Sequence, residues 1–301
     1  MTKTRGKRNV RLFLSVAFFW GPIVHSGHML IDIILPSYNR ASILDRAIQS
    51  VLNQSHQHFR LFVVDDGSTD ETSHVMAKYI GNEKIHYLKQ ENKGVSGARN
   101  YGIKNSSADW IAFLDSDDEW LPQKLATQVK FIQDYPELRF IHSNEIWIRH
   151  GARVNPKKKF DKSNVDIFKR SLELCLISPS TVVMKRELSS QHGHFDESFT
   201  VCEDYDLWLK ILAREEVGFI SEHLIRKYGG HDDQLSTKYH AMDFWRIRSM
   251  SKLISTNISQ DKKEMIREEI KKKAPILLQG FLKHQNHQEH AELTELIKNL
   301  I

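Results

Sequence analysis

Three carboxylates lie within four residues directly after the apolar run 110–114, namely Asp115, Asp117 and Asp118. Carboxylates this close repel one another unless a cation lies among their oxygens. A hard divalent ion such as Mg²⁺ takes oxygen ligands and commonly bridges carboxylates and phosphates. The cluster therefore favours a metal-bound, phosphorylated substrate. The alternative is a turn, in which Asp118 caps the next helix.

A second acidic pair ends another apolar run. Asp65 and Asp66 follow residues 59–64, and Gly67 comes next. Since ligands of open α/β sheets bind beyond the carboxyl ends of the strands, two acidic strand ends on one rim favour a site for a metal and a nucleotide. The Asp66 carboxylate could accept the imide N–H of uracil, and Gly67 would let a backbone approach closely. Asp70 is expected to cap the following helix.

A polar segment also follows the first apolar run, at residues 30–35. It consists of Pro36, Ser37, Tyr38 and Asn39. Proline fixes the backbone, and the Tyr38 ring could stack on a nucleobase. A turn that contains a core tyrosine is the alternative.

Three more positions carry groups suited to a diphosphate or to proton transfer. Gly94 begins a predicted helix that also carries Arg99. A helix N-terminus favours phosphate and an arginine adds a forked donor, although a structural ion pair of Arg99 is the alternative. Glu203 and Asp204 open an amphipathic helix, as candidates for a general base or as partners of the helix dipole. His231 follows two glycines, which fits either a lid over a ligand or a mobile polar loop.

Strands and helices alternate from residue 30 to about 148. The expected strands are 30–35, 59–64, 84–89, 110–114 and 138–148, and the expected helices are 41–54, 70–80, 95–104 and 122–135. This alternation predicts an α/β fold with a mostly parallel sheet and helices on both faces. Further along we expect a basic loop or flap at 151–162, helices at 166–176 and 203–214, strands at 180–184, 217–220 and 224–228, and charged helices at 239–254, 262–273 and 288–300. The amphipathic segment 264–273 is expected to pack on the core domain.

Composition limits the class of protein. The chain has 301 residues and a formal net charge of +5. This charge fits weak attraction to anionic lipid or to an anionic substrate, and it does not argue for nucleic-acid binding. Cys175 and Cys202 lack Cys-x-x-Cys spacing, so we expect reduced thiols and no zinc site.

The N-terminal segment precedes the first predicted strand. Residues 12–24 are apolar but contain Gly21-Pro22, and this run is too short to span a bilayer as a straight helix. We interpret residues 1–28 as an extension upstream of a natural start at Met29, with a membrane-surface anchor or a signal peptide as alternatives. We expect the remaining chain to divide into a main domain at 29–237 and a helical extension at 238–301.

Six motifs follow one another along the chain. They are Leu35-Pro-Ser-Tyr-Asn39, Val64-Asp-Asp-Gly-Ser-Thr-Asp70, Asn92-Lys-Gly-Val-Ser-Gly-Ala-Arg-Asn100, Phe113-Leu-Asp-Ser-Asp-Asp118, Glu203-Asp-Tyr-Asp-Leu-Trp208 and His231-Asp-Asp-Gln-Leu-Ser236. With these motifs the chain resembles a family 2 glycosyltransferase of the GT-A fold over about residues 30–237. The resemblance implies transfer of a sugar from a nucleoside diphosphate donor, favouring a UDP-sugar, with inversion at the anomeric carbon. It also implies a divalent metal, Mg²⁺ or Mn²⁺.

The resemblance assigns roles to individual residues. Those that would bind the nucleotide are Pro36, Ser37, Tyr38, Asn39, Asp66, Gly94, Arg99, Asp115 and Ser116. Asp117 would be the firmest metal ligand, with Asp115 and His231 beside it. Asp204 would be the general base, and Glu203 would orient it or bind the acceptor.

The acceptor is expected to be a glycan or a lipid-linked sugar in the synthesis of lipopolysaccharide, capsule or another cell-surface glycan. This implies a cytoplasmic protein, with peripheral association at the inner face of the membrane left open. The family more often carries an arginine shortly before the histidine of the last motif, where this chain has Arg226 and Lys227 and then two glycines.

Two other functions were weighed. A sugar nucleotidyltransferase needs a Gly-rich, basic loop after the first strand, and the segment at Pro36 is not one. A non-catalytic scaffold would have lost the Asp-x-Asp pair or the base, yet Asp115, Asp117 and Asp204 are all present.

Overall fold

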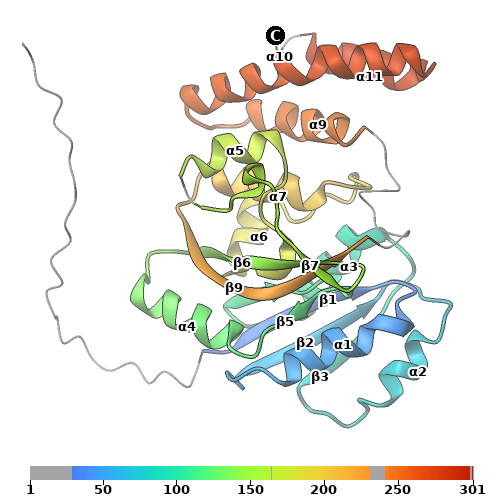
Figure 1. The fold of residues 1–301 in the computed structure, drawn as a ribbon, viewed down its shortest axis with the longest axis vertical. Coiled ribbons are helices and arrows are strands. Elements are labelled where there is room, and N and C mark those ends of the chain that lie inside the picture. Colours follow the sequence, from blue (N-terminus) through green and yellow to red (C-terminus); the bar gives the residue numbers. More distant parts are fainter. Residues whose placement is uncertain (1–28, 164, 231–240, 299, 301) are drawn as a thin grey trace, which may run out of the picture.

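A computed structural model of the chain describes residues 29–163, 165–230, 241–298 and 300. The strands are β1 (Ile31–Ser37), β2 (Phe59–Asp65), β3 (Ile85–Lys89), β4 (Trp110–Phe113), β5 (Glu119–Trp120), β6 (Phe140–Arg149), β7 (Ala152–Val154), β8 (Val183–Lys185) and β9 (Val217–Gly229). The helices are α1 (Ala41–Leu52), α2 (Thr72–Ala77), α3 (Gly94–Asn105), α4 (Lys124–Asp134), α5 (Ile167–Glu173), α6 (Glu187–His192), α7 (Glu203–Leu212), α9 (Met242–Ile254), α10 (Gln260–Lys283) and α11 (His287–Ile297). Short 3₁₀ turns are η1 (Lys158–Phe160) and η2 (Pro179–Thr181). Figure 1 shows their arrangement.

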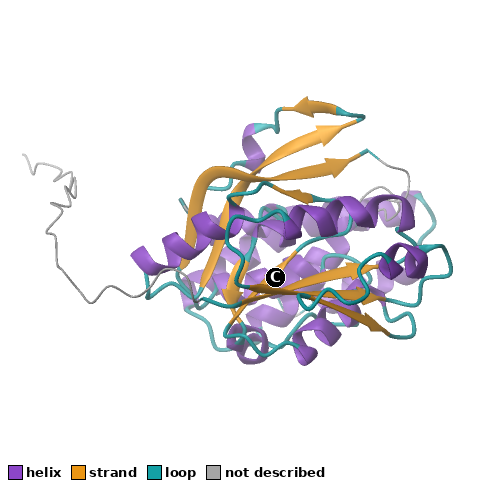
Figure 2. Cartoon of the chain, turned by 90° about the horizontal axis from the view of Figure 1, so that it is seen from below, coloured by secondary structure: helices purple, strands orange, loops and turns teal. Residues whose placement is uncertain are grey.

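All these strands belong to one sheet, in the order β3-β2-β1-β4-β8-β6-β9-β5, with β7 paired to β6. The longer pairings are parallel, β1 with β2 and β4, β2 with β3, and β6 with β9. The antiparallel pairings of β5, β7 and β8 are short. The predicted α/β fold with a mostly parallel sheet is therefore confirmed. The β6–β9 register shifts near Asn144, and such irregularities bend strands; Figure 2 shows the resulting curvature at one end of the sheet.

Side chains of β1 alternate between two hydrophobic clusters, as successive residues of a strand must. Ile33 and Leu35 pack with Leu44 of α1 in one cluster. Ile34 packs with Ile103 of α3 in the other, which continues into α5 and α7. Each face of the sheet is thus covered, so the functional groups on it must lie at the strand ends.

The C-terminal helices stack on the second cluster. In Figure 1, α9, α10 and α11 lie above α5 and α7, on the side away from β1–β3, and their apolar residues belong to the same cluster. Ile266, Ile270 and Ala274 have no exposed surface, which confirms that this stripe packs on the core. The helix continues through Pro275 to Lys283, further than predicted, because tertiary packing of the apolar stripe outweighs local propensity. The domain boundary near 238 stays a prediction, since residues 231–240 lie outside those described.

Three local predictions were wrong or incomplete. The segments 217–220 and 224–228 form one strand, β9, because its backbone keeps pairing with β6 past the polar residues between them. The flap 151–162 contains β7 and η1. The short elements α6 and β5 were not predicted, since neither is long enough to show a periodic pattern.

Candidate active site

One cavity of about 1060 Å³ lies at the carboxyl ends of β1, β2 and β4. The predicted site residues among its lining are Pro36, Ser37, Tyr38, Asn39, Asp66, Gly94, Arg99, Asp115, Ser116, Asp117, Glu203 and Asp204. His231, the remaining predicted ligand, lies outside the described residues. The structure therefore brings together every predicted site residue that it describes, and their individual roles stay predictions.

The Asp-x-Asp loop after β4 is anchored by its last carboxylate. Asp118 is buried, and its two oxygens accept hydrogen bonds from Ser180 Oγ at 2.6 Å and from Tyr228 N at 3.1 Å. Burial, followed by the negative charge of Asp117, raises the pKa of Asp118 well above its usual range. Asp118 does not cap α4, which has no side-chain cap. This anchoring leaves Asp115 and Asp117, both half-buried, as the carboxylates available to a ligand.

Arg99 connects the two acidic parts of the site. Its guanidinium donates to Asp115 Oδ1 at 2.7 Å and to Glu203 Oε1 at 2.5 Å, and the side chain is only 3% exposed. The guanidinium also lies 5.1 Å from the ring centroid of Phe195. The structural ion pair that was the alternative for Arg99 is thus present, and Arg99 still lines the cavity. It fixes the end of β4 relative to the start of α7.

Glu203 and Asp204 begin α7 in different environments. Glu203 is buried, and burial together with the neighbouring Asp204 charge raises its pKa to about 7 despite the ion pair with Arg99. Asp204 is half-buried, and its Oδ1 accepts from Tyr205 N at 2.7 Å. Its Oδ2 faces the thiol of Cys175 at 3.4 Å. Asp204 is therefore the more accessible carboxylate of the two.

The next acid of α7 lies apart from this pair. Asp206 has no exposed surface, and Ser249 Oγ donates to it at 2.8 Å. Trp208 is 2% exposed and packs in the hydrophobic core. Both side chains hold α7, which presents Asp204, against the core.

The rim that is expected to bind the nucleobase is built by the loops after β1 and β2. Asp66 is buried, and its Oδ1 accepts from Gln90 Nε2 at 2.6 Å and from Lys93 N at 2.9 Å. This leaves Oδ2 as the oxygen that could accept from a base. Tyr38 is 48% exposed, so its ring is not a core side chain and stands at the cavity edge. Gly67 has a φ of 79° and lies so close to Asn92 N that an added Cβ would be 3.0 Å away, which explains the need for glycine.

The two loops hold each other in place. Asn39 has a φ of 52°, and its Oδ1 accepts from Thr69 N at 2.8 Å. In return, Asp70 Oδ2 accepts from Ala41 N, the first residue of α1, at 2.9 Å. Asp70 Oδ1 accepts from Thr72 N, the first residue of α2, at 3.0 Å, but the N-cap position of α2 is Glu71, so Asp70 bonds to the helix start from one residue before the cap position that was predicted for it. The side chain of Asn39 is thus part of this reciprocal contact, called the loop latch below.

Some residues at the cavity were not identified from the sequence as part of the site. Arg46 of α1 donates to the backbone carbonyl of Asp117 at 2.5 Å and lies 3.8 Å from the ring centroid of Tyr228. Arg46 and Asp117 are 71 positions apart, and no local pattern could have shown this contact. Lys227, one of the two basic residues before the last motif, lines the cavity, whereas Arg226 pairs with Glu119 at 2.6 Å.

Residues 32–191 match the family described as glycosyl transferase family 2. The chain belongs to this family. A Rickettsia conorii protein described as an uncharacterized glycosyltransferase is 33% identical over 227 residues, which cover 73% of this chain and 36% of that protein. The Escherichia coli glucosyltransferase WfgD is 35% identical over 193 residues, 64% of this chain and 73% of WfgD. The chain spans about a third of the length of the family 2 relatives from R. conorii and Rickettsia felis.

Solved structures of family 2 glycosyltransferases share the GT-A fold found here. Residues 1–349 of S. aureus TarS in complex with UDP-GlcNAc align with a TM-score of 0.74 at 18% identity, over 91% of this chain and 82% of that TarS chain. The Pyrobaculum calidifontis mannosyltransferase PcManGT, with GDP-Man and Mn²⁺, aligns with a TM-score of 0.59 at 17% identity, over 89% of this chain and 74% of PcManGT. Within the described parts of this chain, no helix is both long and apolar enough to cross a membrane.

Enzymes of this fold generally use a divalent metal, and the side chains present fit one. The described residues contain no group of three or more His, Cys, Asp or Glu side chains that could hold a metal by themselves. Asp115 and Asp117 supply two carboxylates, one oxygen of which is bonded to Arg99. Mg²⁺ is typically bound through one or two carboxylates together with substrate phosphates and waters. The carboxylates of Asp115 and Asp117 therefore suit a metal that is bound by this chain and by a diphosphate together.

Proposed function

We propose that this chain transfers a sugar from a UDP-sugar to a hydroxyl group of an acceptor, with inversion at the anomeric carbon. The observation that carries the proposal is the Arg99 bridge. It holds the metal-type carboxylate Asp115 and the start of α7, with Glu203 and Asp204, around one cavity. A metal-bound nucleoside diphosphate needs a carboxylate such as Asp115, and a hydroxyl nucleophile needs a general base such as Asp204.

The preference for UDP and for a cell-surface acceptor rests on relatives. TarS has been solved with UDP and with UDP-GlcNAc. WfgD is described as acting with UDP-Glc on α-D-GlcNAc-diphosphoundecaprenol, and TuaG of Bacillus subtilis as a putative teichuronic acid glycosyltransferase. We infer the same classes for this chain, a UDP-sugar and a sugar carried on a lipid diphosphate. The work would then take place at the cytoplasmic face of a membrane.

In this proposal Asp204 is the general base. The acceptor O–H loses its proton to Asp204 as its oxygen forms a bond to the anomeric carbon, and the bond from that carbon to the diphosphate oxygen breaks. The Asp204 carboxylate is suited to this because it is half-buried and has only the weak Cys175 contact on Oδ2. Burial, with the Asp204 charge, raises the pKa of Cys175 well above its usual range, so the thiol keeps its proton.

The diphosphate would lie against the end of β4. Asp117 and Asp115 would hold the divalent metal, which when bound supplies Lewis-acid stabilisation of the charge on the leaving diphosphate. Lys227 lines the same cavity and its ammonium donates to Ser178 Oγ at 2.7 Å. Burial lowers the pKa of Lys227, but Glu145 and Asp118 raise it above its usual range, so Lys227 carries a positive charge towards the diphosphate. Tyr38 would stack on the base and Asp66 Oδ2 would accept its imide N–H.

The test is a thermal-shift titration with UDP and other nucleoside diphosphates, with and without Mn²⁺. Ligands that bind only the native state raise the melting temperature, so we expect a metal-dependent shift with UDP. Asp117→Asn should remove the metal dependence. Asp109→Asn is the matched control, because Asp109 precedes β4 and its side chain is 83% exposed. Equal UDP shifts with and without metal, or no shift with any nucleotide, would refute the proposal.

A further inference from the structure

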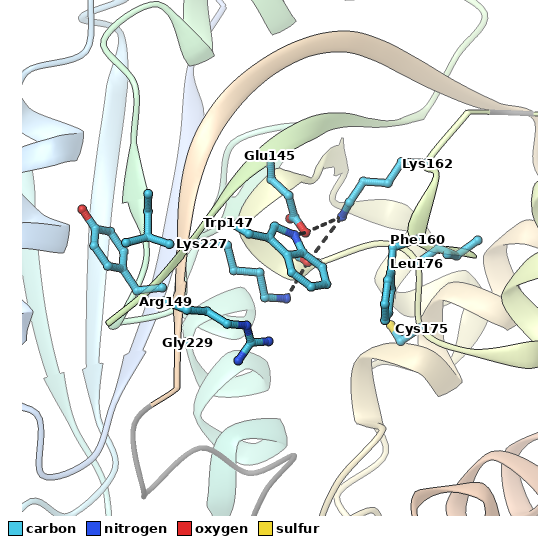
Figure 3. A pocket seen from close by; sticks show the side chains of 12 residues that line it. Glu145, Trp147, Arg149, Phe160, Lys162, Cys175, Leu176, Lys227 and Gly229 are labelled. Carbon is cyan, nitrogen blue, oxygen red and sulfur yellow. Dashed lines mark hydrogen bonds and ion pairs between the residues drawn. The ribbon is translucent and has the colours of Figure 1, made fainter. Parts of the chain in front are cut away.

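A second, smaller cavity of about 260 Å³ adjoins the large one. It lies between β6, β9 and the segment that carries η1, and Lys227 and Tyr228 line both cavities. Figure 3 shows its side chains. Its volume is just below the range of about 300–1,000 Å³ that is usual for drug-sized ligands. A ligand the size of one monosaccharide ring therefore suits it.

One lining residue of this cavity, Glu145, has a carboxylate with an unsatisfied oxygen. Glu145 is 3% exposed, and its Oε1 accepts from Trp147 Nε1 at 2.7 Å and pairs with Lys162 Nζ at 3.0 Å. Its Oε2 is buried and has no hydrogen-bond partner. Although burial raises the pKa of Glu145, Lys162 and Lys227 lower it to about 2, so the group is ionised. A buried anionic oxygen without a donor is costly, and a ligand hydroxyl would satisfy it.

An aromatic wall stands beside this carboxylate. The rings of Trp147 and Phe160 lie 5.0 Å apart at an interplanar angle of 58°, and both line the cavity. In Figure 3, the side chains of Glu145, Trp147 and Lys162 converge on one side of it. A sugar ring has an apolar C–H face and polar hydroxyl edges, so it can pack on an indole ring while its hydroxyls bond to a carboxylate.

The mouth of this cavity is cationic. Arg149 lines it, is exposed, and places its guanidinium 5.6 Å from the Trp147 ring centroid. The flap that follows, residues 151–162, carries the cations Arg153, Lys157, Lys158 and Lys159 in addition to the buried Lys162. Its one carboxylate, Asp161, contacts Arg170 at 3.6 Å. A phosphate attached to the bound sugar would meet this positive charge.

The smaller cavity also reaches the candidate base. Cys175 lines it, and the Cys175 thiol contacts Asp204 Oδ2 at 3.4 Å. A ring bound at Glu145 would therefore lie next to the carboxylate proposed to take the acceptor proton. This position separates it from the nucleotide rim at Tyr38 and Asp66, which belongs only to the large cavity.

We propose that this smaller cavity binds the acceptor as a sugar phosphate, with the sugar ring on Trp147 and Glu145 and its phosphate on Arg149. The inference rests on the function proposed above and names the acceptor side of the same site. In this proposal the buried Glu145 carboxylate binds the sugar, and Arg149 with the basic flap that follows it binds the phosphate that links the sugar to its lipid carrier.

The test is calorimetric titration of the UDP- and Mn²⁺-saturated protein with the 1-phosphates of glucose, galactose, N-acetylglucosamine and N-acetylgalactosamine. UDP blocks the nucleotide part of the large cavity, and variants of Trp147 and Arg149, which line only the smaller cavity, then show whether the measured binding occurs there. We expect at least one sugar phosphate to bind, and Trp147→Ala and Arg149→Ala to weaken it about tenfold, the loss expected for one contact to a charged or aromatic group. The corresponding uncharged sugar should bind more weakly and be insensitive to Arg149→Ala.

The matched control is Arg153→Ala, which removes an exposed arginine of the flap that does not line the cavity. It should leave sugar phosphate binding unchanged. No binding by any of the four sugar phosphates, or equal losses in the Arg149 and Arg153 variants, would overturn the inference. A third result would also overturn it: both the Arg149 and Arg153 variants lose binding to phosphatidylglycerol vesicles while sugar phosphate binding is unchanged. The flap would then be a surface that binds membranes. Failure of UDP itself to bind would instead refute the proposed function.

Discussion

Replacing Arg99 tests whether one buried cation holds the site together. In Arg99→Met the side chain keeps much of its length and loses both ion pairs. The side chains of Arg99 and Glu203 are 3% and 7% exposed, whereas that of Asp115 is 28% exposed. The Glu203 pair therefore dominates, and removing one partner of a buried pair costs about 3–5 kcal/mol because the other charge stays buried. The Asp115 pair adds at most about 1 kcal/mol, as expected for partly exposed pairs.

This loss should depend on pH. Burial and the Asp204 charge raise the pKa of Glu203 to about 7 in the presence of Arg99, and without the guanidinium it must rise further. A raised pKa in the folded state means that folded Glu203 binds its proton more tightly than unfolded Glu203, so its contribution to stability falls as pH increases towards and beyond 7. In the variant, Glu203 can escape its unpaired charge by protonation, and the free energy that this protonation costs rises between pH 6 and pH 8.5. We therefore expect a smaller loss at pH 6 than at pH 8.5.

Urea unfolding followed by tryptophan fluorescence measures this difference at both pH values. The double variant Arg99→Met/Glu203→Gln should recover part of the loss, because it removes the unpaired charge. Lys130→Met breaks an exposed pair, with side chains 75% and 51% exposed, and should change stability by no more than about 0.5 kcal/mol. A loss below about 1 kcal/mol at pH 8.5, against the cited range for buried pairs, or a loss that does not decrease at pH 6, would refute this account of the bridge.

The remaining predictions concern turnover and packing. Asp204→Asn should lower kcat by about 100- to 10,000-fold, the usual contribution of a general base, with UDP affinity within a few fold; an equal fall in UDP binding by calorimetry would reject the role. Gly218→Ala places a Cβ 2.6 Å from Phe131, so urea unfolding should show a loss of about 1–3 kcal/mol, and a neutral result would mean that the ring moves away. Lys124 is fully buried, and burial holds its pKa well below the usual range. The folded protein therefore binds the Lys124 proton more weakly than the unfolded chain, which lowers the free energy of unfolding at neutral pH. This loss disappears as pH rises to the pKa of lysine in the unfolded chain. Lys124→Met should therefore raise the melting temperature at pH 7, although the Gln128 side-chain oxygen loses its hydrogen-bond donor. A gain in melting temperature that does not shrink towards pH 10 would contradict the assignment of this cost to the buried Lys124 charge.

The sequence predicted those parts of the site that follow from local pattern. Asp66 and Asp115 each follow an apolar run, and the parallel pairing of β2, β1 and β4 brings both strand ends to one rim. The helix start at Glu203 was also visible, because an amphipathic pattern begins there. In each case the sequence pattern lies within a few residues of the site residue whose position it predicts.

Contacts between distant side chains could not be predicted in this way. The segment near Lys162 was expected to be a polar loop, yet its ammonium is buried against Glu145 of β6. Similarly, the alternative for Asp118 was a cap of the next helix, and the structure instead bonds it to Ser180 and to the backbone of Tyr228. Each partner is distant in sequence, so only the folded arrangement shows which charge is buried against which group.

The loop latch makes two stretches of chain interdependent. Asn39 bonds to the backbone beyond β2, and Asp70 bonds to the backbone at the start of α1. A chimera of two family members with a crossover between α1 and β2 would take Asn39 from one parent and Asp70 from the other. Such a hybrid would keep the arrangement of these two loops only if the Asn39 segment of one parent and the Asp70 segment of the other can still form both hydrogen bonds of the loop latch. Productive crossovers should therefore fall before β1 or after α2, so that the two loops are inherited as one block.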